Sequence, residues 1–426
     1  MAQDPEEYEH VDAKSEDEKE DTTTSDTSSD ASAAADADVD HDAEDAPSLV
    51  RRQARILDAC RRRDIDDLQA IAISNGGFIS DKIRSQAWPV LLGCRVDDER
   101  GEQKEEASDS WTGLPRHRDE DQVKLDVDRS FVYYPSAEER TTEPTQAQLD
   151  SKRAELSDLI TEVLRRQPYL CYFQGYHDIC QVLLLVLPGR ATRAAAAARL
   201  SALRIRDFML PTLAPAVAHL RLIPDLLGAV DPALAAHLSR VEPYFALADT
   251  LTMFAHNVQR YGDIARLFDA LLAREQVFSI YIFARIVLRR RAELVALDEP
   301  DVLHFTVSKI PQDLDLESVI AEAAALFDAH PPESLRSWRR VSKASALKTA
   351  RDVKVCAAQS LGDGRAFFKR QMREMRWAER REKVLRAAWV NRRIILAVAV
   401  AAGAVYFRKA PIWASLVSWS APARNR

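Results

Sequence analysis

Apolar residues recur at helical spacing through most of this chain, and prolines interrupt the pattern at short intervals. In residues 149–166 the leucine, isoleucine and valine side chains fall on one face of a helix. Similar patterns occupy residues 176–187, 194–209, 216–228, 231–239, 246–258, 262–273, 276–290 and 316–328. We find no segment that alternates apolar and polar residues as a half-buried strand does. The pattern predicts an all-α body.

Composition excludes several other classes of protein. Only 12 of the 426 residues are glycine, well below the ~7% of an average protein, so a turn-rich β fold is not expected. The sequence has no G-x-x-x-x-G-K-[ST] or G-x-G-x-x-G loop for binding a nucleotide by itself. The five cysteines include no C-x-x-C pair and the nine histidines are scattered. We therefore expect reduced thiols, no cofactor and no metal site.

Charge divides the chain into parts. Residues 1–47 hold 18 acidic side chains against two lysines and almost no large apolar residue, which predicts a disordered acidic tail. We expect a leading helix over residues 48–77, a helical domain over 78–330 with a polar, exposed loop at 95–121, and a basic helical segment over 331–393. The basic segment indicates anionic lipid rather than nucleic acid, because it precedes an apolar end of the chain.

The segment from Ile394 to Phe407 has no charged residue. Its 14 residues would span ~21 Å as a helix, short of a ~30 Å hydrocarbon core. Flanking Arg408 and Lys409 could extend this length, and Trp413 and Trp419 suit a headgroup layer. We predict a membrane anchor over residues 394–419 that leaves the body in the cytosol. A helical hairpin in one leaflet and an interfacial helix are the alternatives.

Three short motifs in the first half of the body carry candidate chemistry. They are Arg84-Ser-Gln-Ala-Trp88, Val123-Lys-Leu-Asp126-Val-Asp-Arg129 and Tyr172-Phe-Gln174-Gly175-Tyr-His-Asp178. Taken singly, each has a structural interpretation. Arg84 and Trp88 could pack on one helix face, Asp126 and Arg129 could form a surface ion pair, and Gln174 could cap the following helix.

Taken together, the motifs R-x-x-x-W, V-x-x-D-x-x-R and Y-x-Q resemble those of the TBC-domain GTPase-activating proteins for Rab GTPases. The second motif departs from the family pattern by carrying Val123 in place of isoleucine. The resemblance covers roughly residues 78–290. The form of the third motif, the segment Asp-Phe-Met-Leu-Pro at 207–211 and the apolar end of the chain look most like the membrane-anchored branch that acts on the Rab of endoplasmic-reticulum-to-Golgi traffic.

The resemblance implies a role for each motif. Arg129 would be an arginine finger that stabilises charge on the γ-phosphoryl group, and Gln174 would be a second finger that orients the attacking water. Asp126 would hold Arg129 in place, and Tyr172 and Gly175 would shape the turn that carries Gln174. Arg84 and Trp88 would have a structural role near the site.

The resemblance also implies that GTP and Mg²⁺ are bound by the partner Rab, and that the chain is an activator rather than an enzyme in its own right. The expected location is the endoplasmic reticulum or Golgi membrane, with the body facing the cytosol. Two alternatives remain at this point. One is an inactive Rab-binding scaffold with the same fold, and the other is a membrane tether or adaptor that has no use for Arg129 and Gln174.

Overall fold

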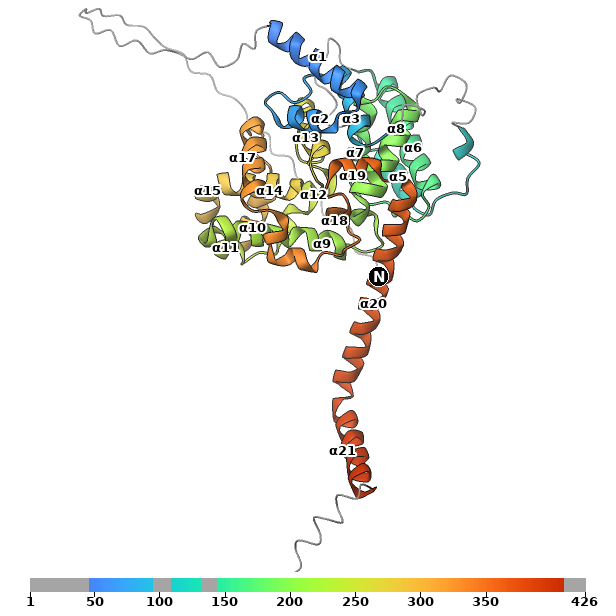
Figure 1. Ribbon diagram of the computed structural model, residues 1–426, viewed down its shortest axis with the longest axis vertical. Helices are drawn as coiled ribbons and strands as arrows, with labels where there is room; N and C mark the ends of the chain where they lie inside the picture. Colours follow the sequence, from blue (N-terminus) through green and yellow to red (C-terminus); the bar gives the residue numbers. More distant parts are fainter. Residues whose placement is uncertain (1–45, 95–108, 132–143, 410–426) are drawn as a thin grey trace, which may run out of the picture. The chain divides into compact units, whose positions relative to one another are not determined.

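A computed structural model describes residues 46–94, 109–131 and 144–409. These residues form α-helices joined by short turns, with no strand among them (Figure 1). The predicted acidic tail lies outside the described residues except for residues 46 and 47, which begin the first helix. The five cysteines are free thiols.

The helices before the third motif carry the first two motifs. They are α1 (Ala46–Arg62), α2 (Ile65–Ile73), α3 (Asp81–Leu91), α5 (Glu120–Val127) and α6 (Gln146–Arg166). The first motif lies in α3, and the second lies in α5 and just beyond it. A capping box starts α6, because the Thr145 side chain accepts from the backbone of Gln148 and the Gln148 side chain binds back to Thr145. The two helices α1 and α2 occupy the range where one leading helix was predicted.

The third motif opens α7 (Tyr176–Val186), which begins a long series of helices. The others are α8 (Arg190–Arg199), α9 (Ala214–Leu220), α10 (Leu222–Val230), α11 (Pro232–Leu238), α12 (Leu247–Thr252), α13 (Tyr261–Ala273), α14 (Phe278–Arg289), α15 (Arg291–Val295), α16 (Pro300–Val307) and α17 (Leu316–Ala329). Proline at the first turn begins α11 and α16, where its missing N–H costs nothing.

The last helices are α18 (Ala346–Thr349), α19 (Val353–Ala358), α20 (Leu361–Val390) and α21 (Arg392–Lys409). One set of buried apolar side chains extends from Ile56 in α1 to Phe368 in α20. This core runs across the domain boundaries that were predicted at residues 77 and 330. A buried polar cluster ties α20 to the body, because Asp207 accepts from the Gln371 amide at 2.7 Å and contacts His219 at 2.8 Å.

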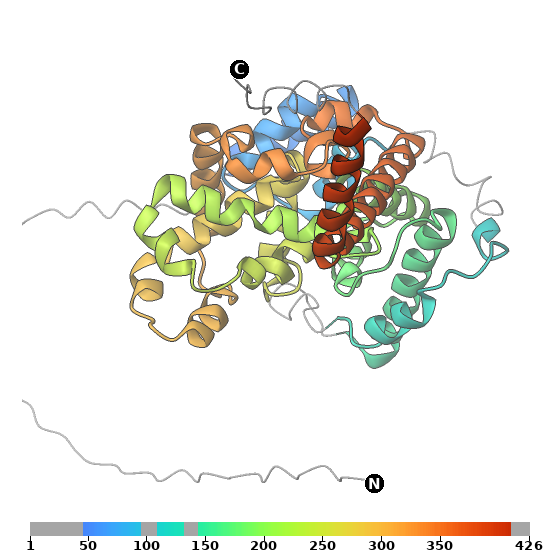
Figure 2. The same ribbon diagram turned by 90° about the horizontal axis from the view of Figure 1, so that it is seen from below.

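The helices of the body form two adjoining groups (Figures 1 and 2). Helices α5 to α8 pack on one another in the first group, and α10, α11, α14 and α17 pack in the second. Contact between α7 and α12 joins the groups near the third motif. This junction positions the candidate site.

The predicted exposed loop at 95–121 is confirmed only in part, because two side chains of its described part are buried and its last two residues belong to α5. Residues 95–108 lie outside the described residues, but Trp111 is only 5% exposed. The guanidinium carbons of Arg165 and Arg190 lie 5.4 and 5.9 Å from its ring centre. Long basic side chains from later helices therefore cover Trp111, while most of the polar side chains around it are exposed.

Among the described residues, no single helix has both the length and the apolar composition to cross a membrane. Helices α20 and α21 meet the criterion only as a pair, with a bend of 67° at the break between them. The side chains described in α21 are largely exposed. The predicted anchor at 394–419 falls partly on α21 and partly on residues 410–419, which lie outside the described residues.

Candidate functional site

Arg129 stands just beyond the end of α5, and its side chain is 68% exposed. Its Nη2 donates to Asp126 Oδ1 over 2.7 Å, and the Asp126 side chain is fully buried. Such charge-assisted bonds are stronger than neutral ones. A buried carboxylate therefore holds an exposed guanidinium at the surface of the protein.

Two further donors satisfy the Asp126 carboxylate. The Gln122 amide donates to Oδ1 over 3.0 Å, and the Tyr172 hydroxyl donates to Oδ2 over 2.9 Å. Burial and the neighbouring Asp126 charge raise the pKa of Tyr172, so its hydroxyl remains a donor at neutral pH. Three hydrogen bonds therefore hold the Asp126 side chain in place, and one of them links the second motif to the third.

Gln174 lies in a sharp turn between Tyr172 and α7. Gly175, the residue before α7, has φ +100°, which favours glycine. A Cβ there would lie 2.6 Å from Thr252 Cγ2. The Gln174 side chain is exposed and forms no hydrogen bond with the part of the chain that the structure describes. Gln174 therefore does not cap α7 here and is available to an incoming group.

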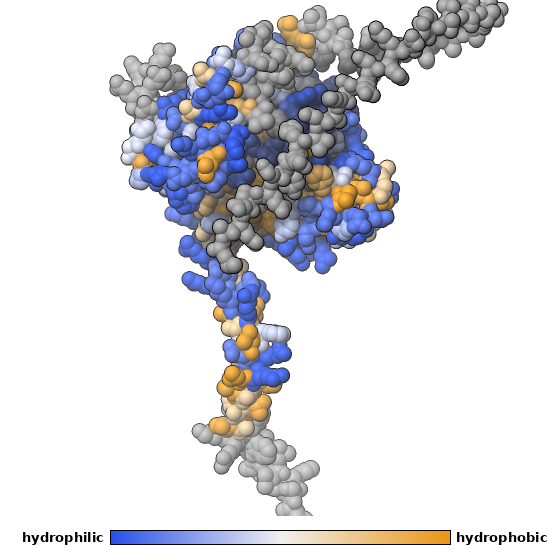
Figure 3. Space-filling model, turned by 180° about the vertical axis from the view of Figure 1, so that it is seen from behind, coloured by the Kyte–Doolittle hydropathy of each residue, from blue (hydrophilic) through white to orange (hydrophobic). Residues whose placement is uncertain are grey.

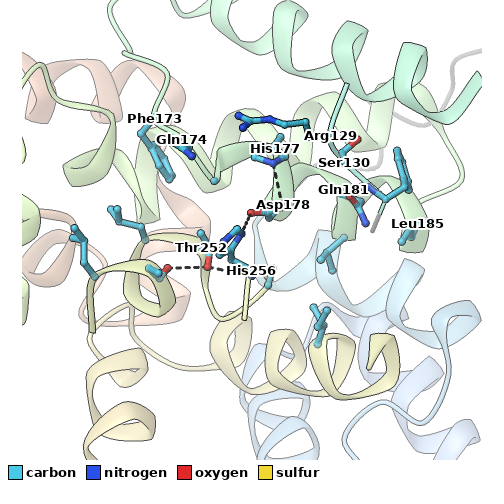
Figure 4. Close-up of a pocket in the computed structure, with 18 of the residues that line it drawn as sticks. Arg129, Ser130, Phe173, Gln174, His177, Asp178, Gln181, Leu185, Thr252 and His256 are labelled. Atoms are coloured by element: carbon cyan, nitrogen blue, oxygen red, sulfur yellow. Dashed lines mark hydrogen bonds and ion pairs between the residues drawn. The ribbon is translucent and has the colours of Figure 1, made fainter. Parts of the chain in front are cut away.

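Arg129 and Gln174 both line a pocket of about 690 Å³ between the two helix groups. In Figure 4 the two side chains lie along the same edge of this pocket. Its walls are largely apolar and come from α7, the segment before α12, α12 itself and α13. Their apolar side chains include Phe173, Leu185, Tyr244, Leu247, Leu251 and Ile264. The arrangement can present two polar donors to a partner at the rim of an apolar hollow.

A pair of histidines flanks Asp178 in the same pocket (Figure 4). His256 Nδ1 lies 3.0 Å from Asp178 Oδ2, and His177 Nε2 lies 3.3 Å from Oδ1. The hydrogen bond with Asp178 raises the pKa of His256, whereas burial lowers the pKa of His177. His177 Nδ1 also lies 3.2 Å from the Tyr172 hydroxyl. Polar contacts thus run from His256 to Arg129.

Arg84 and Trp88 do not line this pocket. Arg84 Nε lies 3.1 Å from Asp269 Oδ1, and Trp88 Nε1 donates to the same oxygen over 2.8 Å. Arg84 also binds Asp81, which accepts from the hydroxyl of Tyr261 in the pocket wall over 2.6 Å. The first motif therefore braces α3 against α13 behind the pocket.

The sequence interpretation named Arg129, Asp126, Tyr172, Gln174 and Gly175, and the structure brings these five together. It did not assign roles to Asp178, His256, Thr252 or Asp269. Each of these has a neighbour that is distant in sequence: Asp178 meets His256, Thr252 lies beside Gly175, and Asp269 binds Arg84. Among the described residues no group of three or more His, Cys, Asp or Glu side chains is placed to hold a metal ion.

Comparison with protein families gives one match across this site. The Rab-GTPase-TBC domain family matches residues 81–295, which include all three motifs.

Curated relatives match a larger part of the chain. TBC1 domain family member 20 of Bos taurus is 33% identical over 79% of this chain and 81% of its own length. The GTPase-activating protein gyp10 of Schizosaccharomyces pombe is 32% identical over 73% of this chain and 81% of its own length. The Ypt/Rab-GAP domain of Gyp1p, a solved structure, shares the fold with a TM-score of 0.55 and 16% identity, over 66% of this chain and 99% of that domain.

Proposed function

Because the chain belongs to the Rab-GTPase-TBC domain family, we propose that it is a GTPase-activating protein for a Rab-family small GTPase. One observation carries the proposal. An exposed arginine held by a buried aspartate lies at the same pocket edge as an exposed glutamine that has no hydrogen-bond partner among the described residues.

Arg129 suits the chemistry of GTP hydrolysis. In the transition state, negative charge spreads over the γ-phosphoryl oxygens, and an arginine supplied by a partner protein can raise the rate by ~10³–10⁵. The guanidinium has five N–H donors. In Arg129 the bond to Asp126 uses Nη2, so donors on the other nitrogens face solvent and can reach phosphate oxygens.

Gln174 suits the second requirement, an oriented attacking water. A side-chain amide both accepts and donates hydrogen bonds, so it can fix the water and contact the GTPase backbone. We assign Gln174 to this task and Arg129 to charge stabilisation. The partner Rab supplies GTP and Mg²⁺, so this chain contributes side chains to a reaction that occurs on another protein.

We also propose that the protein acts at a membrane. The apolar helix α21 at the end of the described chain and the basic residues before it support this part of the proposal. The greater number of basic residues on the N-terminal side of α21 favours a cytosolic body. A short Ala/Val-rich segment suits a thin membrane such as the endoplasmic reticulum. A Rab of endoplasmic-reticulum-to-Golgi traffic is the proposed substrate.

The decisive experiment measures GTP hydrolysis by a panel of GTP-loaded Rabs in the presence of the purified full-length chain. Release of phosphate by at least one Rab should accelerate by orders of magnitude. Rab binding without acceleration would instead indicate an inactive scaffold. Neither binding nor acceleration with any Rab would indicate a tether or adaptor and would contradict the proposal.

A further inference from the structure

Helix α20 has two unlike halves. Its first turns pack on the body, where Gly364, Phe368 and Gln371 are buried. Close packing requires the glycine, because a Cβ at Gly364 would lie 2.8 Å from the carbonyl oxygen of Ala202. From residue 376 to the end of the helix, every side chain is exposed or nearly so. The second half therefore extends away from the body, and no described part of the chain packs against it.

Large apolar side chains lie along this exposed half. Trp377, Val384, Leu385 and Trp389 are between 56% and 69% exposed. Leu385 and Trp389 follow Trp377 by 8 and 12 residues. At ~100° per residue, the three side chains therefore fall on one side of the helix. In Figure 3, hydrophobic residues alternate with hydrophilic ones along the helix that leaves the body. A soluble helix with no partner would not be expected to expose two tryptophans on one face.

The opposite face of the same half is basic. Apart from Arg381, residues 376–390 hold four basic side chains, Arg376, Arg380, Lys383 and Arg386, against two glutamates. Both glutamates already pair within the helix, Glu379 with Lys383 at 2.7 Å and Glu382 with Arg386 at 2.9 Å. The remaining excess of positive charge complements anionic lipid headgroups.

We propose that residues 376–390 form an amphipathic helix that lies in the plane of an anionic membrane surface, with Trp377, Leu385 and Trp389 in the lipid interface. A helix with an aromatic and aliphatic face and a Lys/Arg-rich polar face has the composition of such interfacial helices. The inference deepens the proposed membrane association, but it does not require α21 to span the bilayer.

The bend after α20 agrees with this placement. The apolar helix α21 leaves α20 at an angle of 67°. A helix lying on the surface must turn by a large angle before a following apolar segment can enter the bilayer. A straight continuation would instead keep the apolar residues of α21 in the headgroup layer.

A second copy of the chain fits this face less well than lipid does. Arg381 lies on the apolar face, with its guanidinium carbon 5.8 Å from the centre of the Trp377 ring. In a symmetric pairing of helices, the arginines of both copies would approach each other in the seam. On a membrane, Arg381 can reach the phosphates while its stem and Trp377 remain in the interface.

The exposed half of α20 is rigidly attached to the body. Gln371, six residues before Trp377, donates to buried Asp207 and accepts from Arg206 Nε over 3.2 Å. The embedded half and the packed half belong to one uninterrupted helix. Docking of residues 376–390 therefore sets the orientation of the whole body on the membrane. A flexible tether would leave that orientation free.

The test uses the full-length chain with Cys171→Ser, which removes the one cysteine that is not buried. Single cysteines at positions 377, 385 and 389, and at positions 379, 383 and 386 on the polar side, carry an environment-sensitive dye. The protein is reconstituted in phosphatidylcholine vesicles with or without phosphatidylserine. Lipids that carry a nitroxide quench the dye where it contacts the membrane interface, so the extent of quenching measures this contact.

We expect several-fold stronger quenching at 377, 385 and 389 than at 379, 383 and 386 in the vesicles with phosphatidylserine. Without that lipid, the quenching at the first three positions should weaken several-fold. Equal quenching on both sides would overturn the in-plane helix, and equal quenching in both vesicles would overturn the role of the basic face. A shielded dye without quenching by lipid would show that a second copy covers the face and would also overturn the proposal.

Labels at positions 398 and 400 separate this inference from the proposed anchor. Quenching there by deep nitroxides reports whether α21 enters the hydrocarbon core. Absence of deep quenching with periodic quenching in α20 would refute the anchor and leave the in-plane helix intact. Deep quenching at 398 and 400 without the periodic pattern in α20 would support the anchor and overturn the in-plane helix.

Discussion

Arg129 and Asp126 form an ion pair whose two members have opposite environments, because the arginine side chain is 68% exposed and the aspartate is fully buried. Their nitrogen and oxygen atoms lie 2.7 Å apart. An exposed long side chain ordinarily keeps most of its rotamer freedom. Here a buried carboxylate restricts it before any partner arrives, which lowers the entropy lost when Arg129 meets a phosphate.

Replacement of Arg129 by alanine should remove nearly all acceleration of Rab GTP hydrolysis. The exposed side chain supports no core, so the helical circular dichroism and the melting temperature should change little. Arg129→Lys should restore little activity, because an ammonium is a point charge without the planar fork. A lysine variant that kept most of the activity would contradict the arginine-finger assignment.

Removal of the Tyr172 hydroxyl tests the positioning of the finger. Tyr172→Phe deletes a donor to Asp126 Oδ2 and leaves the ring in place. We expect the rate of stimulated hydrolysis to fall ~10- to 100-fold because Arg129 is held less firmly, with little change in Rab binding. Tyr244→Phe, in the pocket wall, is a matched control that should retain activity. A fall in Rab affinity without a fall in the rate at saturating Rab would contradict the positioning role.

Gln174→Ala should also abolish most of the activity. The sharper measurement uses a Rab whose own catalytic glutamine is replaced. If Gln174 orients the water, this mutant Rab should remain substantially responsive to the wild-type activator. A complete loss of response would mean that the glutamine of the Rab positions the water and that Gln174 has another role.

Much of the site could be predicted because its parts are local in sequence. Asp126 and Arg129 are three residues apart, which brings their side chains together on one helical turn. Gly175 follows Gln174 directly, so a sharp turn there could be expected. The helix pattern from residue 149 to 328 agrees with α6 to α17 because buried faces repeat at the period of the helix.

Contacts between distant segments could not be predicted in this way. The Tyr172 hydroxyl meets Asp126 across 46 residues, and His256 meets Asp178 across 78. Asp269 accepts hydrogen bonds from Arg84 and Trp88, which lie in a helix more than 180 residues earlier in the sequence. Periodicity shows which face of a helix is buried, but not which other helix packs on it. The exposed half of α20 was predicted as basic, yet its tryptophan face emerges only once burial is known.

Deletion of residues 394–426 should release much of the protein from membranes and leave its activity on soluble Rab unchanged. The deleted segment lies far from Arg129 and Gln174 in the sequence, and the described part of α21 contributes no residue to the core. The truncated protein should keep a residual association that high salt removes, because α20 remains basic. Fractionation at low salt, at high salt and in carbonate measures this.

In cells, the deletion should impair function more than it does in solution, because confinement to one membrane raises the effective concentration of activator near a lipid-anchored Rab. Release of the intact protein by carbonate alone would refute the anchor. Such a result would favour a purely interfacial attachment through α20.

Asp249 in α12 gives the pocket wall a predictable dependence on pH. Its carboxylate is fully buried, Oδ1 accepts from the Asn257 amide over 2.9 Å, and Oδ2 has no hydrogen-bond partner among the described residues. Burial raises the pKa of Asp249 to about 7, and the nearby charge of His256 opposes that shift. In the unfolded chain the pKa of an aspartate is about 3.9.

Between these two pKa values the folded protein binds a proton that the unfolded chain does not. The free energy of unfolding should therefore fall as the pH rises from about 4 to 7, by up to about 4 kcal/mol from this group. Asp249→Asn retains an acceptor for Asn257 and cannot ionise. The stability of Asp249→Asn relative to the wild type should therefore rise between about pH 4 and pH 8, because only the wild type loses the stabilising proton.

Urea unfolding at several pH values measures this difference, since the titrations of all other groups are common to both proteins. Asp301→Asn, at an exposed aspartate of α16, is the matched control and should follow the wild-type curve. Parallel curves for wild type and Asp249→Asn would mean that Asp249 is already ionised in the folded protein at low pH. An unseen partner for Oδ2 would then have to stabilise its charge.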